Sequence, residues 1–99
     1  MQIDVAISEL IEKYAKSPWD INNGDCEGFA LDLIEMIGGE DWDTNCLGDY
    51  GDLCELLPGH VWVWKDGKHY DAECPDGVTN PLELPIFNRT IGILTKQKA

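Results

Sequence analysis

The sequence predicts one α+β domain, residues 1–99, in which helices pack on one side of a small antiparallel sheet. Two patterns predict this fold class. Apolar residues recur at helical spacing in two runs before residue 38, and the spacing then changes to the alternation of two strands joined by a tight turn. A length of 99 residues with 43% hydrophobic residues is typical of one domain with one modest core.

Two helices are expected in the N-terminal part of the chain. The first runs over residues 3–16 and ends before Pro18, because the residue preceding a proline avoids the helical region. The second follows the polar residues 22–25 and ends at Gly38. Its inward face carries Cys26, Ala30, Leu33 and Ile37. The thiol of Cys26 is therefore expected in the first turn of a helix, facing the interior.

The segment 40–58 has a weaker pattern. Asp41, Asp43 and Asn45 alternate as at the opening of a calcium loop, but Cys46 stands where that loop requires glycine. The four cysteines and two histidines contain no zinc-knuckle spacing. We therefore expect no metal site and no cofactor, and a short helix over residues 53–57.

A hairpin is expected over residues 60–73, with a two-residue turn at Asp66 and Gly67. This register pairs Trp62 with Asp71, so His60 faces the same side of the sheet as Asp71, and Glu73 lies across from His60. A three-residue bulged turn would send Asp71 to the opposite face. Beyond the hairpin, the prolines of residues 74–88 predict an irregular loop, and residues 90–95 predict a further strand.

The charge of the chain limits its partners. There are 7 basic and 19 acidic residues, giving a net charge of -12, and residues 17–64 contain no Lys or Arg. Binding to a phosphate backbone requires basic side chains, so nucleic acids and anionic membranes are not expected partners. The N-terminus lacks a secretory signal pattern, which favours a cytoplasmic location with Cys46, Cys54 and Cys74 as reduced structural or surface thiols.

Three residues of the predicted elements suit nucleophilic catalysis. Cys26 is expected at a helix start, where the helix dipole favours the thiolate. His60 begins the first strand of the hairpin, and Asp71 lies on the returning strand. In acyl transfer an imidazole takes the thiol proton and a carboxylate fixes the tautomer of the ring. Glu73 is the rival for the role of the acid.

The two segments that carry these residues resemble a known family. N-G-D-C-E-G-F-A at residues 23–30 is similar to the nucleophile helix of transglutaminase-like and papain-like cysteine proteins. G-H-V-W-V-W-K-D-G-K-H-Y-D-A-E at residues 59–73 resembles their H-x-W strand and the following strand with its acid. The resemblance implies a minimal papain-like fold with Cys26 as nucleophile, His60 as base and Asp71 as third member.

Other site residues follow from these assignments. The papain branch has a glutamine before its cysteine, whereas here Gln2 and Gln97 are far from Cys26 along the chain. The oxyanion donors are therefore expected to be the Cys26 backbone N–H together with Asn22, Asn23 or Trp19. Trp62 and Trp64 share the face of His60 and are expected to pack against the nucleophile helix, with a cleft wall as a secondary role; His69 is expected at the surface.

The predicted function is cysteine-dependent acyl transfer on an amide or isopeptide bond: hydrolysis, deamidation or cross-linking. The substrate is expected to be a protein or peptide, and the acidic surroundings favour a basic one. The acidic residues Asp25 and Glu27 beside Cys26 oppose thiolate formation. The alternative is a binding protein without catalysis, built on a degenerate hydrolase fold, whose acidic surface mimics nucleic acid and occupies a basic site on a partner.

Overall fold

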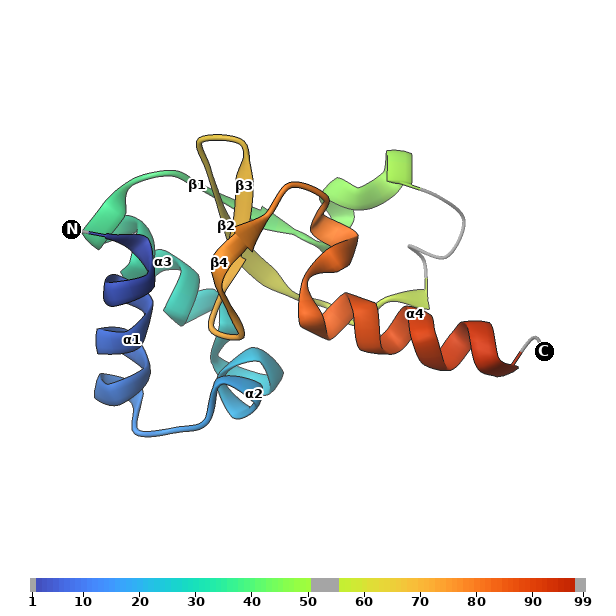
Figure 1. The fold of residues 1–99 in the computed structure, drawn as a ribbon, viewed down its shortest axis with the longest axis horizontal. Helices are drawn as coiled ribbons and strands as arrows, with labels where there is room; N and C mark the ends of the chain where they lie inside the picture. The colour runs from blue at the N-terminus through green and yellow to red at the C-terminus, as the bar shows by residue number, and fades with distance from the viewer. Residues whose placement is uncertain (1, 51–55, 98–99) are drawn as a thin grey trace.

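The molecule is built around a four-stranded antiparallel sheet in the order β1-β2-β3-β4 (Figure 1). The computed structural model describes residues 2–50 and 56–97. The strands run over Glu40–Asp43, Val61–Lys65, Lys68–Asp71 and Cys74–Val78. The predicted α+β class is confirmed, since N-terminal helices pack on this sheet.

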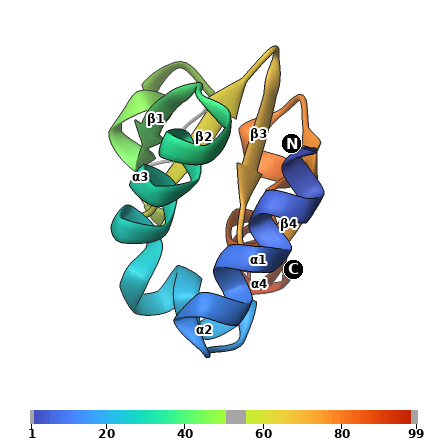
Figure 2. The ribbon, with the colours of Figure 1, turned by 90° about the vertical axis from the view of Figure 1, so that its left-hand side faces the viewer.

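The helices α1 (Ile3–Tyr14) and α3 (Cys26–Ile37) cover one face of the sheet. Figure 2 shows them side by side, with the short helix α2 (Pro18–Asp20) at their lower end. Both predicted helices are confirmed. The first ends earlier than expected, because Ala15 adopts the left-handed conformation (φ 55°) that terminates a helix. Pro18 instead opens α2.

The run between α2 and α3 is helical and not a loop. Residues Ile21–Asp25 form a turn of π-helix, η1, which joins α2 to α3, although Asp25 leaves the helical conformation (φ -117°, ψ 15°) just before Cys26. Single π-helical turns of this kind are rare and often occur at functional sites. Cys26 is consequently the first residue of α3 but does not lie at a free helix end.

The predicted hairpin register is confirmed. Lys65 pairs with Lys68 and Trp64 with His69 across a two-residue turn. Asp66 and Gly67 both have positive φ, 50° and 85°, as the turn type that matches strand twist requires. The side chains of the hairpin therefore point to the faces of the sheet that the sequence predicts.

The C-terminal part of the chain differs from the prediction. Residues 74–88 are not an irregular loop, because Cys74–Val78 forms β4 and Pro81–Glu83 forms a 3₁₀ turn, η4. Residues 90–95 are not a strand but part of α4 (Pro85–Gln97). The β-branched residues of this segment favour a strand, but the segment continues the helix that begins at Pro85 and packs on Trp62 through Phe87. The apolar positions that make this contact, Leu84, Phe87 and Ile91, have helical spacing.

Helices therefore lie on both faces of the sheet, and not on one as predicted. Val63 and Tyr70 face α1 and α3, whereas Trp62 is buried against Leu84 and Phe87 on the side of η4 and α4. Contrary to the prediction, Trp62 does not pack against α3, because alternation along β2 turns it to the opposite face from Val63. The sheet separates two small cores.

The acidic segment that follows α3 forms the edge of the sheet. Glu40–Asp43 pairs with β2 as strand β1, and residues Thr44–Tyr50 form a 3₁₀ helix, η2. The backbone N–H of Asn45 donates to Asp43 Oδ1 (2.8 Å). The short helix predicted over residues 53–57 lies mostly outside the described residues. Within the described ranges, no helix has the length and apolar character needed to cross a bilayer.

Candidate catalytic site

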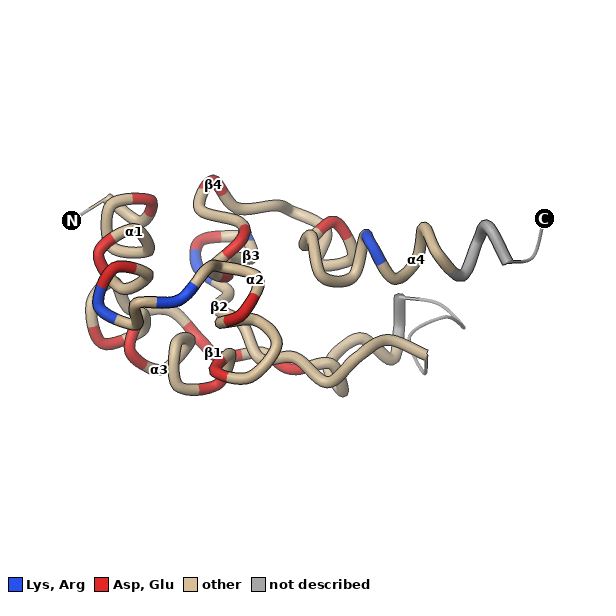
Figure 3. Tube along the Cα trace, turned by 90° about the horizontal axis from the view of Figure 1, so that it is seen from below, with Lys and Arg blue, Asp and Glu red and all other residues tan. Residues whose placement is uncertain are grey.

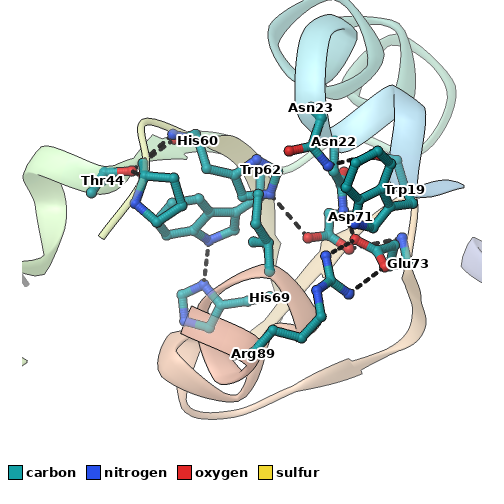
Figure 4. A network of polar contacts seen from close by, with 12 residues as sticks. Trp19, Asn22, Asn23, Thr44, His60, Trp62, His69, Asp71, Glu73 and Arg89 are labelled. Carbon is teal, nitrogen blue, oxygen red and sulfur yellow. Dashed lines mark hydrogen bonds and ion pairs between the residues drawn. The ribbon is translucent and has the colours of Figure 1, made fainter. Parts of the chain in front are cut away.

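His60 and Asp71 form a buried pair on the α4 side of the sheet. His60 immediately precedes β2 and Asp71 ends β3, and Nε2 of His60 lies 3.0 Å from Oδ2 of Asp71 (Figure 4). The exposed fractions of the two side chains are 0% and 2%. The two-residue turn sets this approach, because it places both residues on one face of the hairpin.

Asp71, and not Glu73, is the acid that contacts His60. β3 ends at Asp71, so Glu73 lies in the turn toward β4 and not across from His60. Its backbone N–H donates to the second carboxylate oxygen of Asp71, Oδ1, at 2.9 Å. Both oxygens of Asp71 are thus held, and the carboxylate is fixed in the orientation that meets the imidazole.

The ring of His60 is fixed by aromatic contacts and by its backbone. Trp62 stacks on it with ring centroids 5.7 Å apart, and Phe87 of α4 meets it edge-on at the same separation. The backbone N–H of His60 donates to Oγ1 of Thr44 (2.8 Å), and its carbonyl accepts from the N–H of Thr44 (3.1 Å). The second ring nitrogen, Nδ1, is buried and makes no hydrogen bond in the described structure.

A polar network connects the site to the helical run that leads to Cys26. The carboxylate of Glu73 accepts two hydrogen bonds from Arg89 of α4, at 2.7 and 2.9 Å. It also accepts one from the side-chain amide of the buried Asn22, at 2.9 Å. Hydrogen bonding by Arg89 lowers the pKa of Glu73, so the network keeps its charge through the neutral range. Glu73 therefore joins η1, the β3–β4 turn and α4.

Cys26 is the third predicted member. Its thiol is half-buried and not part of a disulfide, and within the described residues it makes no hydrogen bond with His60 or Asp71. The neighbouring Asp25 is paired with Lys16 at 2.5 Å, which partly offsets the negative charge beside the thiol. The structure thus brings His60 and Asp71 into contact and leaves Cys26 as a free thiol on the adjacent helix.

The predicted oxyanion donors occupy η1 and α2. The side-chain amide of Asn23 donates to the carbonyl of Trp19 at 2.7 Å, and that of Asn22 donates to Glu73. The indole of Trp19 is 54% exposed. Because the helical run begins at Pro18, the unpaired N–H groups of a helix start lie there and not at Cys26.

The remaining aromatic residues of the hairpin support the structure. Trp62 is completely buried, so it contributes to the core and not to an accessible cleft wall. Trp64 is half-buried and stacks with Trp42 of β1. The prediction that His69 lies at the surface is wrong: it is 2% exposed, and its Nδ1 accepts a hydrogen bond from Trp62 Nε1 (2.9 Å). Burial lowers the pKa of His69 and so favours the neutral ring that can accept this bond.

The other thiols differ sharply in exposure. Cys46 is exposed and Cys74 is buried, and both are free, whereas Cys54 lies outside the described residues. Burial, with the nearby Asp71 carboxylate as the second cause, raises the pKa of Cys74 to about 11. Cys74 is therefore a thiol at neutral pH. No group of three or more potential metal ligands occurs among the residues that the structure describes.

Two contributors to the site were missed at the sequence level. Arg89 is the single arginine of the chain, and that rarity was the available indication that it has a specific partner. Thr44 holds the backbone of His60 from 16 residues away, and no local pattern indicates this contact. Both reach the site through tertiary structure.

Comparisons of the chain with protein-family models, with curated proteins and with solved structures find no match.

Proposed function

We propose that the protein catalyses acyl transfer on an amide or isopeptide bond, with Cys26 as nucleophile, His60 as general base and Asp71 as the residue that orients the ring. One observation carries the proposal: the buried His60 bonds Asp71 through Nε2 while its Nδ1, also buried, has no partner among the described residues. A buried polar atom without a partner costs about 1–3 kcal/mol, and its retention is typical of a functional group.

The pairing defines which nitrogen is basic. An ionised carboxylate only accepts hydrogen bonds, so Nε2 of His60 carries the proton that Asp71 accepts. In the neutral ring Nδ1 then holds the free lone pair and can take a proton. The acid thus fixes the tautomer that a thiol proton transfer needs.

In this proposal Cys26 supplies that proton. Asn22 lies four residues earlier in the same helical run, and its amide reaches the carboxylate of Glu73, beside Asp71. Residues four apart lie on similar sides of a helix, and on this ground the proposal has Cys26 approach the site past the β3–β4 turn, at the end of the sheet where His60 meets Asp71. The imidazole is enclosed, and the half-exposed Cys26 is therefore the member that meets the substrate.

The reaction needs only these side chains, the substrate, and water or a second amine. Nδ1 of His60 takes the thiol proton, and the thiolate forms a carbon–sulfur bond to the carbonyl carbon. Collapse of the tetrahedral intermediate breaks the carbon–nitrogen bond, and the imidazolium returns the proton to the leaving amine. Water or a second amine then attacks the thioester while Nδ1 takes its proton; the carbon–sulfur bond breaks, the acyl group leaves on the new oxygen or nitrogen, and the imidazolium returns the proton to the thiolate.

The test measures the reactivity of each thiol with iodoacetamide across pH, with the modified residue identified by mass spectrometry. Cys46 is the internal control, because it is more exposed than Cys26 and its thiol donates to the carboxylate of Asp43 (4.0 Å) and not to an imidazole. We expect Cys26 to react at least about tenfold faster than Cys46 at neutral pH, since the thiolate is the reactive form. His60→Ala should remove this advantage and leave the rate of Cys46 unchanged.

A conservative variant covers the case in which His60→Ala does not fold. Asp71→Asn preserves the shape of the site, but its amide can donate to Nε2 and so place the ring proton on Nδ1. We expect the rate of Cys26 to fall toward that of Cys46 while circular dichroism stays unchanged. Equal slow labelling of all accessible thiols in the unmodified protein would refute the proposal and favour the acidic binding protein instead.

A further inference from the structure

A groove lies between α1, α2 and the turn that joins β3 to β4. Its volume is about 660 Å³, within the range of about 300–1,000 Å³ that is typical of ligand sites. The floor includes Ile7, Ile11 and Ala72, and the walls include Pro18 and Trp19. Ile7 and Ala72 belong to the core on the α1 side, so the groove opens on the face of the sheet opposite the His60–Asp71 pair; it shares with the site Glu73, which binds Asn22 of the run that leads to Cys26.

The rims of the groove carry unneutralised negative charge. Asp4 of α1 and Asp76 of β4 are exposed and make no hydrogen bond or ion pair within the described structure. The carboxylate of Glu73 is already bound by Arg89 and Asn22. No lysine or arginine lines the groove. Figure 3 shows acidic positions on α1, α2 and β4, the elements that border it. Its electrostatic character therefore favours a cation.

Trp19 adds an aromatic surface to this negative rim. Its side chain is 54% exposed, whereas Trp62 is completely buried. A cation over the face of an exposed indole is stabilised by the ring quadrupole. An aliphatic stem can at the same time lie on Ile7 and Ile11, as the side chains of lysine and arginine do on apolar surfaces.

We propose that this groove binds a lysine or arginine side chain of the polypeptide substrate, with Trp19, Asp4 and Asp76 as the residues that select it. The inference rests on the proposed function, since it assigns the substrate class of the same site. An apolar floor with a negative rim fits a side chain that has a long apolar stem and a positive end.

The test uses the full chain with Cys26→Ser, so that binding is measured without turnover. A capped tripeptide with a central lysine is titrated and followed by ¹H–¹⁵N NMR at the Trp19 indole N–H. The matched probe replaces lysine with norleucine, which keeps the stem and removes the charge. We expect lysine and arginine peptides to shift the Trp19 resonance. They should bind about tenfold more tightly than the norleucine peptide, because only a cationic side chain can pair with the carboxylates of Asp4 and Asp76.

The protein side is tested with two variants of equal charge change. Asp4→Asn with Asp76→Asn should weaken binding of the lysine peptide about tenfold and reduce its salt dependence. Glu40→Gln with Asp41→Asn is the control, because β1 lies at the opposite edge of the sheet from β4. This control should change the affinity less than about twofold, since exposed charges beyond a Debye length are screened.

Three results would overturn the inference: norleucine binding as tightly as lysine, equal weakening by the two charge variants, or no shift at Trp19. These results are separate from the thiol test. If Cys26 is labelled selectively but the groove shows no preference for lysine, the groove proposal is refuted and the proposed catalysis stands. The reverse combination would refute the proposed catalysis and leave the groove proposal standing: the Cys26→Ser protein binds the lysine peptide, but in the unmodified protein Cys26 is labelled no faster than Cys46.

Discussion

At the scale of single residues, His60 shows how a polar group is retained in a core. Its ring has no exposed area, yet only one of its two nitrogens is bonded within the described structure. Trp62 and Phe87 hold the ring in place by contact, and Thr44 fixes its backbone. The ring is thus oriented from several elements while the buried Nδ1 has no partner among the described residues, and the proposed proton transfer uses this nitrogen.

At Gly77 the neighbouring residues leave no room for a side chain. This glycine has φ 75° in β4, and a Cβ built there would lie 2.6 Å from the ring of the buried Tyr70. We expect Gly77→Ala to lower the free energy of unfolding by about 2–4 kcal/mol, the sum of left-handed strain and overpacking. Urea denaturation measures this change.

Gly67 supplies the matched control for this prediction. It has a similar φ of 85°, but a Cβ there meets nothing within 4 Å. Gly67→Ala should therefore cost about 1–2 kcal/mol, from backbone strain alone. Equal losses for the two variants would show that contact with Tyr70 does not determine the choice of glycine at position 77.

At the scale of elements, the turn between β3 and β4 organises the site. Its residue Glu73 binds Arg89 of α4 and Asn22 of η1 through the side chain, and Asp71 through the backbone. These bonds connect the helical run that carries Cys26 to the strand that carries the acid. The ion pair is bidentate, which gives it a defined geometry.

The Arg89–Glu73 pair predicts a pH-dependent contribution to stability. The pKa of Glu73 is lowered from 4.5, so the folded state binds its proton less readily than the unfolded state. The stabilisation is then present above pH 4.5 and is lost as pH falls through the lower, folded-state value. We expect Arg89→Met to cost about 1 kcal/mol at pH 7 and less at pH 3, measured by urea denaturation at both values.

Lys16→Met is the matched control for Arg89→Met. It removes the same charge from an ion pair, with Asp25, whose members are more exposed. Its cost at pH 7 should be smaller, because water screens an exposed pair more effectively. The proposed role of Glu73 would be contradicted if Arg89→Met lowers the free energy of unfolding no more than Lys16→Met does. It would also be contradicted if the effect of Arg89→Met is as large at pH 3 as at pH 7.

At the scale of the whole molecule, the dominant feature is its negative charge. A net charge of -12 on 99 residues produces self-repulsion that disfavours the folded state. We expect the midpoint of urea unfolding to rise when NaCl is increased from about 10 mM to about 150 mM, because the Debye length falls from about 30 Å to about 8 Å. KCl should act equally, since screening depends on ionic strength. An unchanged or lower midpoint would contradict a net repulsive charge distribution.

The sequence by itself determined the elements whose patterns are local. The periodic runs set α1 and α3, and Asp66 with Gly67 set the hairpin register, from which the approach of His60 to Asp71 follows. The same patterns also indicated the acidic surface. These features depend on residues near one another in the chain, or on a strand pairing that a two-residue turn fixes.

Tertiary structure alone decided the C-terminal part and the surroundings of the site. Residues 90–95 have strand-forming side chains, but they continue α4, whose residues Phe87 and Ile91 pack on the Trp62 face. His60 contacts Asp71 and not Glu73 because β3 ends at Asp71. His69 is buried because it lies against Trp62, whose indole N–H bonds to it. The physical reason is that contacts between distant segments outweigh local preferences of a few tenths of a kcal/mol to about 1 kcal/mol per residue.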